Sequence, residues 1–255
     1  MNAKLLIVIS AIASTMMVGC ASTNSPNATR NEIPLFSNGG PYAATFETHK
    51  EVMEMFDSTG KLLDEDAVAY LWNTSDSAVR VPVAGGTVSM NGTSLTLVDE
   101  TANGGGKYYQ NDVNFDNTVP FSTSGGSLVF SASGGASFAG LADSITFPNS
   151  DIHVTAPTFS TSISKSAGFT VTWNYISGST NSIAIQVIGD SSGYQLYLVS
   201  DNGNYSVPSA DLSAFSGNTR VRVSRISYKS ARDASNRNYA MVAYTTSTIY
   251  HSLVP

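Results

Sequence analysis

Short segments in which apolar and polar residues alternate dominate the chain from residue 43 onward, and clusters of Gly, Asn and Ser separate them. Alternation with a period of two places successive side chains on opposite faces of a strand. Apolar residues at the three-to-four spacing of an amphipathic helix are scarce. The pattern therefore predicts an all-β protein with short turns.

The first part of the chain predicts several strands of unequal length. Residues 43–56 can form one long or two short strands, and residues 67–72 follow after a turn. The segments 87–90 and 94–98 flank Asn91-Gly92, a dipeptide that suits a tight hairpin because both central positions accept a positive φ.

A second set of six or seven strands occupies about 100 residues after a boundary that we place near residue 155. Their number and spacing fit a small two-sheet sandwich. We expect two domains, 41–155 and 156–255. The clearest strands of the second domain are 169–175, 182–188, 194–200, 205–208, 219–228 and 239–254.

The segment GFTVTW, which ends at Trp173, and the strand rhythm after it resemble fibronectin type III and immunoglobulin-like modules. The resemblance covers about 100 residues and implies a β-sandwich. No cysteine pair is present, which excludes the disulfide-bonded antibody type. The expected fold class is thus all-β, with two tandem β-sandwich domains.

The first twenty residues, MNAKLLIVISAIASTMMVGC, follow the order of an export signal. Lys4 lies in a short polar start, an apolar stretch runs from Leu5 to Val18, and the small residue Gly19 precedes Cys20. The apolar stretch is too short to span a bilayer comfortably, so residues 1–19 are predicted to be a cleaved signal peptide.

Gly19-Cys20 resembles the lipobox of bacterial lipoproteins, in which the cysteine is acylated and becomes the mature N-terminus, although Met17 stands where Leu is commoner. As the only cysteine, Cys20 cannot form an internal disulfide, and acylation with chains such as palmitate would remove a free thiol from an oxidising compartment. The alternative is an ordinary secretory signal that contains one cysteine.

The residues after Cys20 bear on the predicted location of the protein in the cell. No Asp follows the cysteine, and by resemblance this favours the outer membrane of a two-membrane bacterium. Residues 20–40 are rich in Ser, Thr, Asn and Pro and have little to bury, so we expect a flexible tether. In this hypothesis the lipid anchors the chain to the membrane, and nothing spans it.

Charge differs between the two ends of the chain. The net charge is −6, yet the segment from residue 212 to residue 255 carries six basic residues against the single acid Asp233. Alternation along the predicted strand 219–228 places Val221 and Val223 on one face and Arg220 and Arg222 on the other. We consider Arg220, Arg222 and Arg225 as binding residues, since guanidinium groups match phosphate and carboxylate. The alternative is a solvated sheet face that balances the acidic first part. An acidic protein without an aromatic and basic platform argues against nucleic acid as a partner.

Two motifs raise the question of catalysis. GDSSG around Ser191 matches G-x-S-x-G, but it connects two predicted strands, whereas the nucleophile turn of hydrolases connects a strand to a helix. Ser162 with Lys165, and the later Ser200 to Asn202, resemble motifs of penicillin-binding proteins, but the third motif K-T-G is absent. Turns explain both motifs better, and no catalytic residue is assigned.

The sequence gives little support for a bound metal or cofactor. Asp112, Asn114 and Asp116 alternate as the first ligands of a calcium loop would, but Asn117 and Thr123 occupy positions that need Gly and Glu. One cysteine and three scattered histidines argue against a structural zinc site. We expect no metal and no cofactor.

Three functions compete for this protein. The first is a non-enzymatic envelope lipoprotein that binds a partner or has a structural role. The second is a carbohydrate-binding surface module, in which Trp72 or Trp173 would form a flat platform, although core burial is the commoner fate of Trp in sandwiches. The third is a serine hydrolase that uses Ser191. The sequence favours the first, with the membrane and an envelope protein or glycan as partners.

Overall fold

The computed structural model describes residues 42–54, 61–76, 81–103, 106–111, 125–159, 161–189 and 194–254. In these residues the regular structure is β-strand, apart from two short 3-10 helices, η1 (Thr101–Asn103) and η2 (Ser209–Leu212). The prediction of an all-β sandwich fold is confirmed. The predicted signal peptide, the tether and Cys20 lie outside the described residues.

One large sheet forms the centre of the molecule. A two-residue strand, β10 (Ile163–Ser164), pairs with one end of β16. All neighbours on the main path are antiparallel except β1 and β16, which are parallel over ten residue pairs. In spatial order the strands of this main sheet are β13 (Tyr194–Ser200), β12 (Ser182–Gly189), β15 (Asn218–Arg232), β16 (Asn238–Val254), β1 (Ala44–Glu54), β2 (Lys61–Leu71), β6 (Lys107–Gln110) and β5 (Thr96–Asp99).

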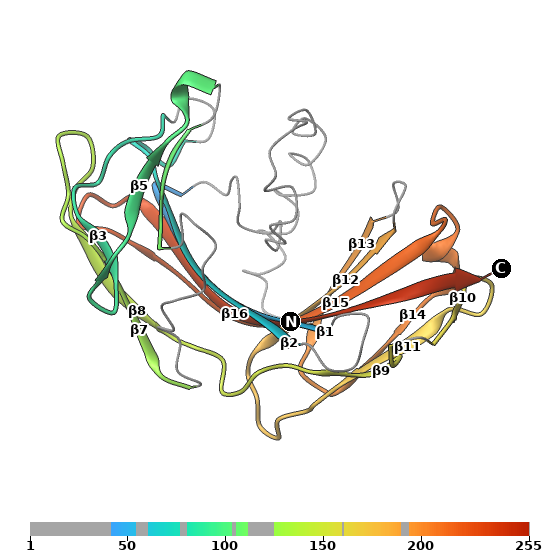
Figure 1. Cartoon of the computed structure of the whole chain (residues 1–255). Helices are drawn as coiled ribbons and strands as arrows, with labels where there is room; N and C mark the ends of the chain where they lie inside the picture. The colour runs from blue at the N-terminus through green and yellow to red at the C-terminus, as the bar shows by residue number, and fades with distance from the viewer. Residues whose placement is uncertain are drawn as a thin grey trace.

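Two smaller sheets cover one face of the main sheet. Figure 1 shows that the main sheet bends between them and that both lie on its convex side. The four-stranded sheet contains β4 (Thr93–Ser94), β3 (Val88–Met90), β7 (Ser127–Ala132) and β8 (Leu141–Thr146). The three-stranded sheet contains β14 (Asn204–Val207), β11 (Phe169–Trp173) and β9 (Val154–Ala156).

The hairpin predicted at Asn91-Gly92 is present between β3 and β4. Both residues have a positive φ, 47° at Asn91 and 82° at Gly92. Asn91 Oδ1 also accepts a hydrogen bond from the backbone N–H of Val129 at 2.8 Å, which ties the turn to β7. The local sequence therefore determined this turn.

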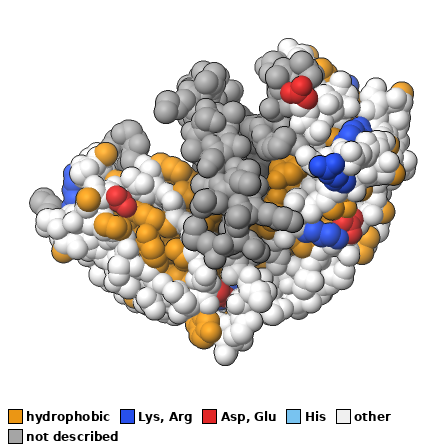
Figure 2. Space-filling view, turned by 180° about the vertical axis from the view of Figure 1, so that it is seen from behind, with side chains coloured by type: hydrophobic (Ala, Val, Ile, Leu, Met, Phe, Trp, Pro, Cys, Tyr) orange, Lys and Arg blue, Asp and Glu red, His pale blue; other side chains and the backbone are white. Residues whose placement is uncertain are grey.

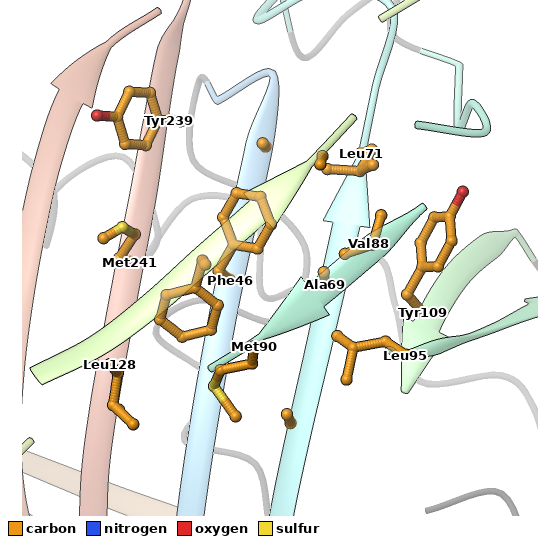
Figure 3. Close-up of a cluster of buried hydrophobic side chains, with 14 of the residues drawn as sticks. Phe46, Ala69, Leu71, Val88, Met90, Leu95, Tyr109, Leu128, Tyr239 and Met241 are labelled. Atoms are coloured by element: carbon orange, nitrogen blue, oxygen red, sulfur yellow. The ribbon is translucent and has the colours of Figure 1, made fainter. Parts of the chain in front are cut away.

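Each smaller sheet encloses its own hydrophobic core against the main sheet. The first core lies under the four-stranded sheet, where the rings of Phe46 and Phe130 are 5.2 Å apart (Figure 3). The second core lies under the three-stranded sheet and contains Val171, Trp173, Ile183, Ile185, Val221 and Val223.

The long strand β16 contributes to both cores by simple alternation. Met241 and Ala243 belong to the first core and Ile249 to the second. Val242 and Tyr244 lie on the opposite, concave side of the sheet in a third, smaller cluster. A single strand with a period of two thus holds two cores on one face.

The predicted domain boundary near residue 155 separates the two smaller sheets, since β8 ends at Thr146 and β9 begins at Val154. It does not separate the main sheet. β1 and β2 from the first part pair in one sheet with β12, β15 and β16 from the second. The two sandwiches therefore share a layer and are not joined only by a linker.

A polar seam lies on the main sheet between the two cores. Thr245 and Ser247 of β16 accept hydrogen bonds from the backbone N–H groups of Ile152 and Val154, each at 3.2 Å. Lys50 of β1 forms a 2.9 Å ion pair with Asp151. These contacts fix the segment that passes from one small sheet to the other.

Arg225 is fully buried in this seam and bonds to three separate parts of the chain. Its Nε donates to Asp201 Oδ2 at 2.8 Å, and its terminal nitrogens donate to the backbone oxygens of Ser150 at 3.2 Å and Asn174 at 2.6 Å. The other oxygen of Asp201 accepts from Trp173 Nε1 at 2.8 Å. The pair is buried and surrounded by further hydrogen bonds, the arrangement in which removal of one partner is most costly.

We expect Asp201→Asn to lower the free energy of unfolding by about 3–5 kcal/mol, because it leaves the Arg225 charge buried without its counterion. Urea denaturation followed by tryptophan fluorescence measures this loss. The matched control is Asp99→Asn, which removes the exposed ion pair with Lys107 and should leave the urea midpoint nearly unchanged. Equal effects of the two substitutions would contradict this role of Arg225.

His251 is a second buried polar residue, at the far end of β16. Its Nδ1 lies 3.0 Å from the carbonyl oxygen of Thr161, which requires a proton on that nitrogen. Its Nε2 and the hydroxyl of the cross-strand residue Thr219 have no hydrogen-bond partner in the described part of the chain. Burial lowers the pKa of His251, although the bond to Thr161 opposes this effect.

The lowered pKa of His251 predicts a loss of stability in acid. The unfolded chain binds the proton more readily than the folded one. The contribution of His251 to the free energy of unfolding is therefore complete above the unfolded pKa of about 6.5, and it is lost as the pH falls through the lower folded pKa. His251→Gln, whose amide can still donate to Thr161, should weaken this dependence. The measurement is the free energy of unfolding between pH 7.5 and 5, and identical pH slopes in both proteins would contradict the prediction.

Candidate functional site

The face of the main sheet that points away from both small sheets brings together aromatic, charged and apolar side chains. We call it the concave face. Side chains reach it from alternate positions of seven strands, as the cross-strand registers show. Its principal residues are Tyr70, Trp72 and Tyr108 at one end, Glu47, His49 and Tyr244 at the centre, and Arg220, Arg222, Gln186, Tyr194, Leu196 and Leu198 at the other end.

An aromatic stack occupies the end near β2 and β6. The ring of Tyr70 lies between those of Trp72 and Tyr108, with centroid distances of 6.0 and 5.8 Å. Trp72 is nearly parallel to Tyr70, at an interplanar angle of 13°. Trp72 is buried, whereas Tyr70 and Tyr108 are half-buried. Flat aromatic side chains in this arrangement offer area for stacking at a low cost in conformational entropy.

A buried polar group lies at the centre, where β1 and β16 run parallel. The hydroxyl of Tyr244 donates to Glu47 Oε1 at 2.5 Å. The Tyr244 ring stacks on His49 at a centroid distance of 4.6 Å. All three side chains are at least 94% buried. This group therefore fixes a carboxylate and an imidazole in the middle of the concave face.

Arg222 lies beyond the centre, towards β12. Its Nε donates to Thr248 at 3.3 Å and its Nη1 to the Gln186 amide oxygen at 3.4 Å. Gln186 in turn donates to the hydroxyl of Tyr194 at 3.2 Å. Burial raises the pKa of Tyr194, while the bond from Gln186 and the Arg222 charge oppose the rise. The phenol therefore stays protonated at neutral pH.

Apolar side chains complete this end of the concave face. Ala184, Ile226 and Val242 are buried there, and Leu196, Leu198 and Tyr228 are partly buried around them. Figure 2, a view from behind, shows hydrophobic side chains gathered in two areas on opposite sides of the view. The concave face is thus aromatic at one end, polar in the middle, and mixed apolar and cationic at the other end.

The three arginines considered as binding residues do not form one row. Val221 and Val223 point into the second core, so Arg220 and Arg222 point to the concave face as the alternation predicts. Arg225 is three positions beyond Arg222 and therefore lies on the opposite face, in the ion pair with Asp201. Arg220 is half-buried, with its guanidinium 6.0 Å from the centre of the Tyr250 ring.

The two tryptophans differ in environment. Trp173 is part of the second core, which is the expected fate of Trp in a sandwich. Trp72 is also buried, but it belongs to the aromatic stack of the concave face and not to the first core. The spacing of Tyr70 and Trp72 by two residues was visible in the sequence, but the partner Tyr108 depends on the pairing of β2 with β6.

The described residues of the motifs examined for catalysis lie in or next to strands or take part in structural contacts. GDSSG, including Ser191, extends into residues outside the described ranges, and the strands on either side of it, β12 and β13, pair antiparallel as predicted. Lys165 donates to the carbonyl oxygen of Phe215 at 2.9 Å, and Asp201 binds Arg225. The hydrogen bonds of Lys165 and Asp201 thus go to structural partners and not to a serine.

Two further sequence features concern metals and the membrane. The segment with Asp112, Asn114 and Asp116 lies outside the described residues. Within the described ranges, no three His, Cys, Asp or Glu side chains come together in a way that suits a metal ion. The same part of the chain contains no helix with the length and apolar character needed to cross a membrane.

No protein-family model matches the chain, and no curated protein sequence matches it significantly.

Proposed function

We propose that this chain is a lipid-anchored protein of the bacterial cell envelope, in the outer membrane, that binds a partner through its concave face and catalyses no reaction. The anchor is Cys20, whose position after an apolar stretch and Gly19 supports acylation. The observation that carries the binding role is the concave face itself, because it combines stacked aromatic rings, fixed polar groups and apolar side chains on one surface.

The bonding of the polar groups supports binding over catalysis. The carboxylate of Glu47 is engaged by Tyr244, and Arg222 is engaged by Gln186 and Thr248. A general base needs access to the proton that it removes, and a nucleophile needs such a base beside it. The side chains of Glu47 and Arg222 are both at least 95% buried, so they hold the sheet in place. The half-buried Tyr70, Tyr108 and Arg220 are the side chains that a partner can contact.

The anchor is tested by Cys20→Ser in the full-length protein expressed in a bacterial host. We expect the native protein to fractionate with membranes after a high-salt wash and to carry acyl mass on a mature N-terminus at Cys20. The variant should be soluble or uncleaved. Recovery of Cys20→Ser in washed membranes, or a native chain without acyl mass, would refute the lipid anchor.

The aromatic stack favours a carbohydrate as a second candidate ligand. Sugar rings present flat apolar faces that can stack on Tyr70 or Tyr108, and the neighbouring polar groups can bond hydroxyls. Trp72 is 6.0 Å from Tyr70, whereas Trp173 is buried in the second core and bonded to Asp201. A change in tryptophan fluorescence on binding would therefore come from Trp72.

We expect titration of the detergent-purified protein with envelope and host glycans to change the fluorescence of Trp72, and Trp72→Phe to abolish that change. Tyr70→Ala should weaken binding about tenfold, equivalent to ~1.4 kcal/mol, because it interrupts the stack. The matched control is Tyr175→Ala, since Tyr175 is 55% exposed on a loop after β11. An unchanged signal across a broad glycan panel would exclude the carbohydrate but not a protein partner.

A further inference from the structure

The main sheet ends in two edge strands of very different character. β5 is the last strand on one side and β13 the last on the other. Of the described strands, β13 pairs only with β12. Alternate backbone N–H and C=O groups of an edge strand point away from its single neighbour, and they are available to another strand.

The other edges are short, interrupted or charged. β8, an edge of the four-stranded sheet, has six residues but carries Asp143, which forms a 2.6 Å ion pair with Lys229. β5 has four residues and ends at Asp99, which forms a 2.9 Å ion pair with Lys107. β9 has three residues and is followed by Pro157, and β14 has four and is followed by Pro208. β4 has two residues. Short length, charge and proline are the usual means by which proteins protect edges from pairing.

β13 has none of these protections. Its seven residues, YQLYLVS, include no charged residue, no proline and no glycine. Tyr194 at one end is 37% exposed, and the five residues between the two ends are half-buried. On the convex side, Gln195 and Tyr197 bond to Asp211 of η2, which holds the strand in its extended form.

In β13, leucines flank Tyr197 on both sides, at positions 196 and 198. A two-fold axis through Tyr197 would place Leu196 opposite Leu198 of a second copy, and Leu198 opposite Leu196. Both leucines lie on the concave face and are only partly buried in one copy. Antiparallel pairing would complete their cover with identical side chains and bury no charge.

We propose that β13 pairs antiparallel with β13 of a second copy of this chain, so that the main sheet continues across a symmetric dimer and the two concave faces adjoin. A second copy fits better than an unrelated peptide for one reason. A second copy places Leu196 opposite Leu198 on the concave face, and neither strand brings a charged residue to the contact. Such an isologous contact is self-complementary and closes without forming a filament.

The first experiment measures the molar mass of the full-length, detergent-purified protein by light scattering over a concentration series. We expect the wild type to have twice the monomer mass. Leu196→Lys should reduce this twofold, to the monomer mass, because it places a charge against the partner's leucine. Leu97→Lys on β5, where Leu97 is 41% exposed, is the matched control and should keep the dimer mass. A monomeric wild type, or a dimer that persists in folded Leu196→Lys, would overturn the proposal.

The second experiment tests the same contact by covalent crosslinking. Tyr197→Cys lies on the proposed two-fold axis, and Cα atoms of directly opposed antiparallel residues are about 4.5–5.5 Å apart, within the range of a disulfide. We expect oxidation to crosslink two copies of Tyr197→Cys, while Leu97→Cys and the wild type, which retains Cys20, stay uncrosslinked. Equal crosslinking of both variants, or capture of a different protein by Tyr197→Cys alone, would rule out the second copy as the occupant.

Discussion

The pairing of β15 with β16 is the interaction on which the rest of the structure depends. The two strands form a continuous antiparallel ladder of fifteen residue pairs, from Asn218–Ser252 to Arg232–Asn238. This length exceeds that of an ordinary strand and spans both sandwiches. The ladder joins β13, β12 and β15 to β16, β1 and β2, so without it the main sheet would divide and the two sandwiches would no longer share a layer.

Sharing one layer between two cores creates a problem at the point where the cores meet. A strand that continues through this region has side chains that lie between the two hydrophobic cores. These side chains face the segment that connects the two small sheets, and the backbone groups of that segment need hydrogen-bond partners. Thr245, Ser247 and Arg225 meet this need by bonding the backbone of residues 150–154 and Asn174. Buried polar groups are stable only when their bonds are complete, and here Asp201 supplies the charge that Arg225 requires.

The same shared layer creates the candidate site. Two separate sandwiches would expose two unrelated outer faces. A single bent sheet instead brings residues from β2, β1, β16 and β12 to one concave surface. Tyr70, Glu47 and Arg222 are far apart in the sequence, and only the cross-strand registers place them in one series.

The sequence by itself determined the strands, the turn at Asn91-Gly92, the opposite orientation of Val221 and Arg222, and the approximate division between the smaller sheets, because these depend on local conformational preference and on a period of two. Spacing alone also separates Arg225 from Arg222, since three positions along a strand reverse the face. Only the tertiary structure decided that the two sandwiches share one sheet, that Arg225 meets Asp201, and that Tyr108 stacks on Tyr70. Strand order and pairing between distant segments depend on the free energy of packing the whole chain, which no short stretch of sequence contains.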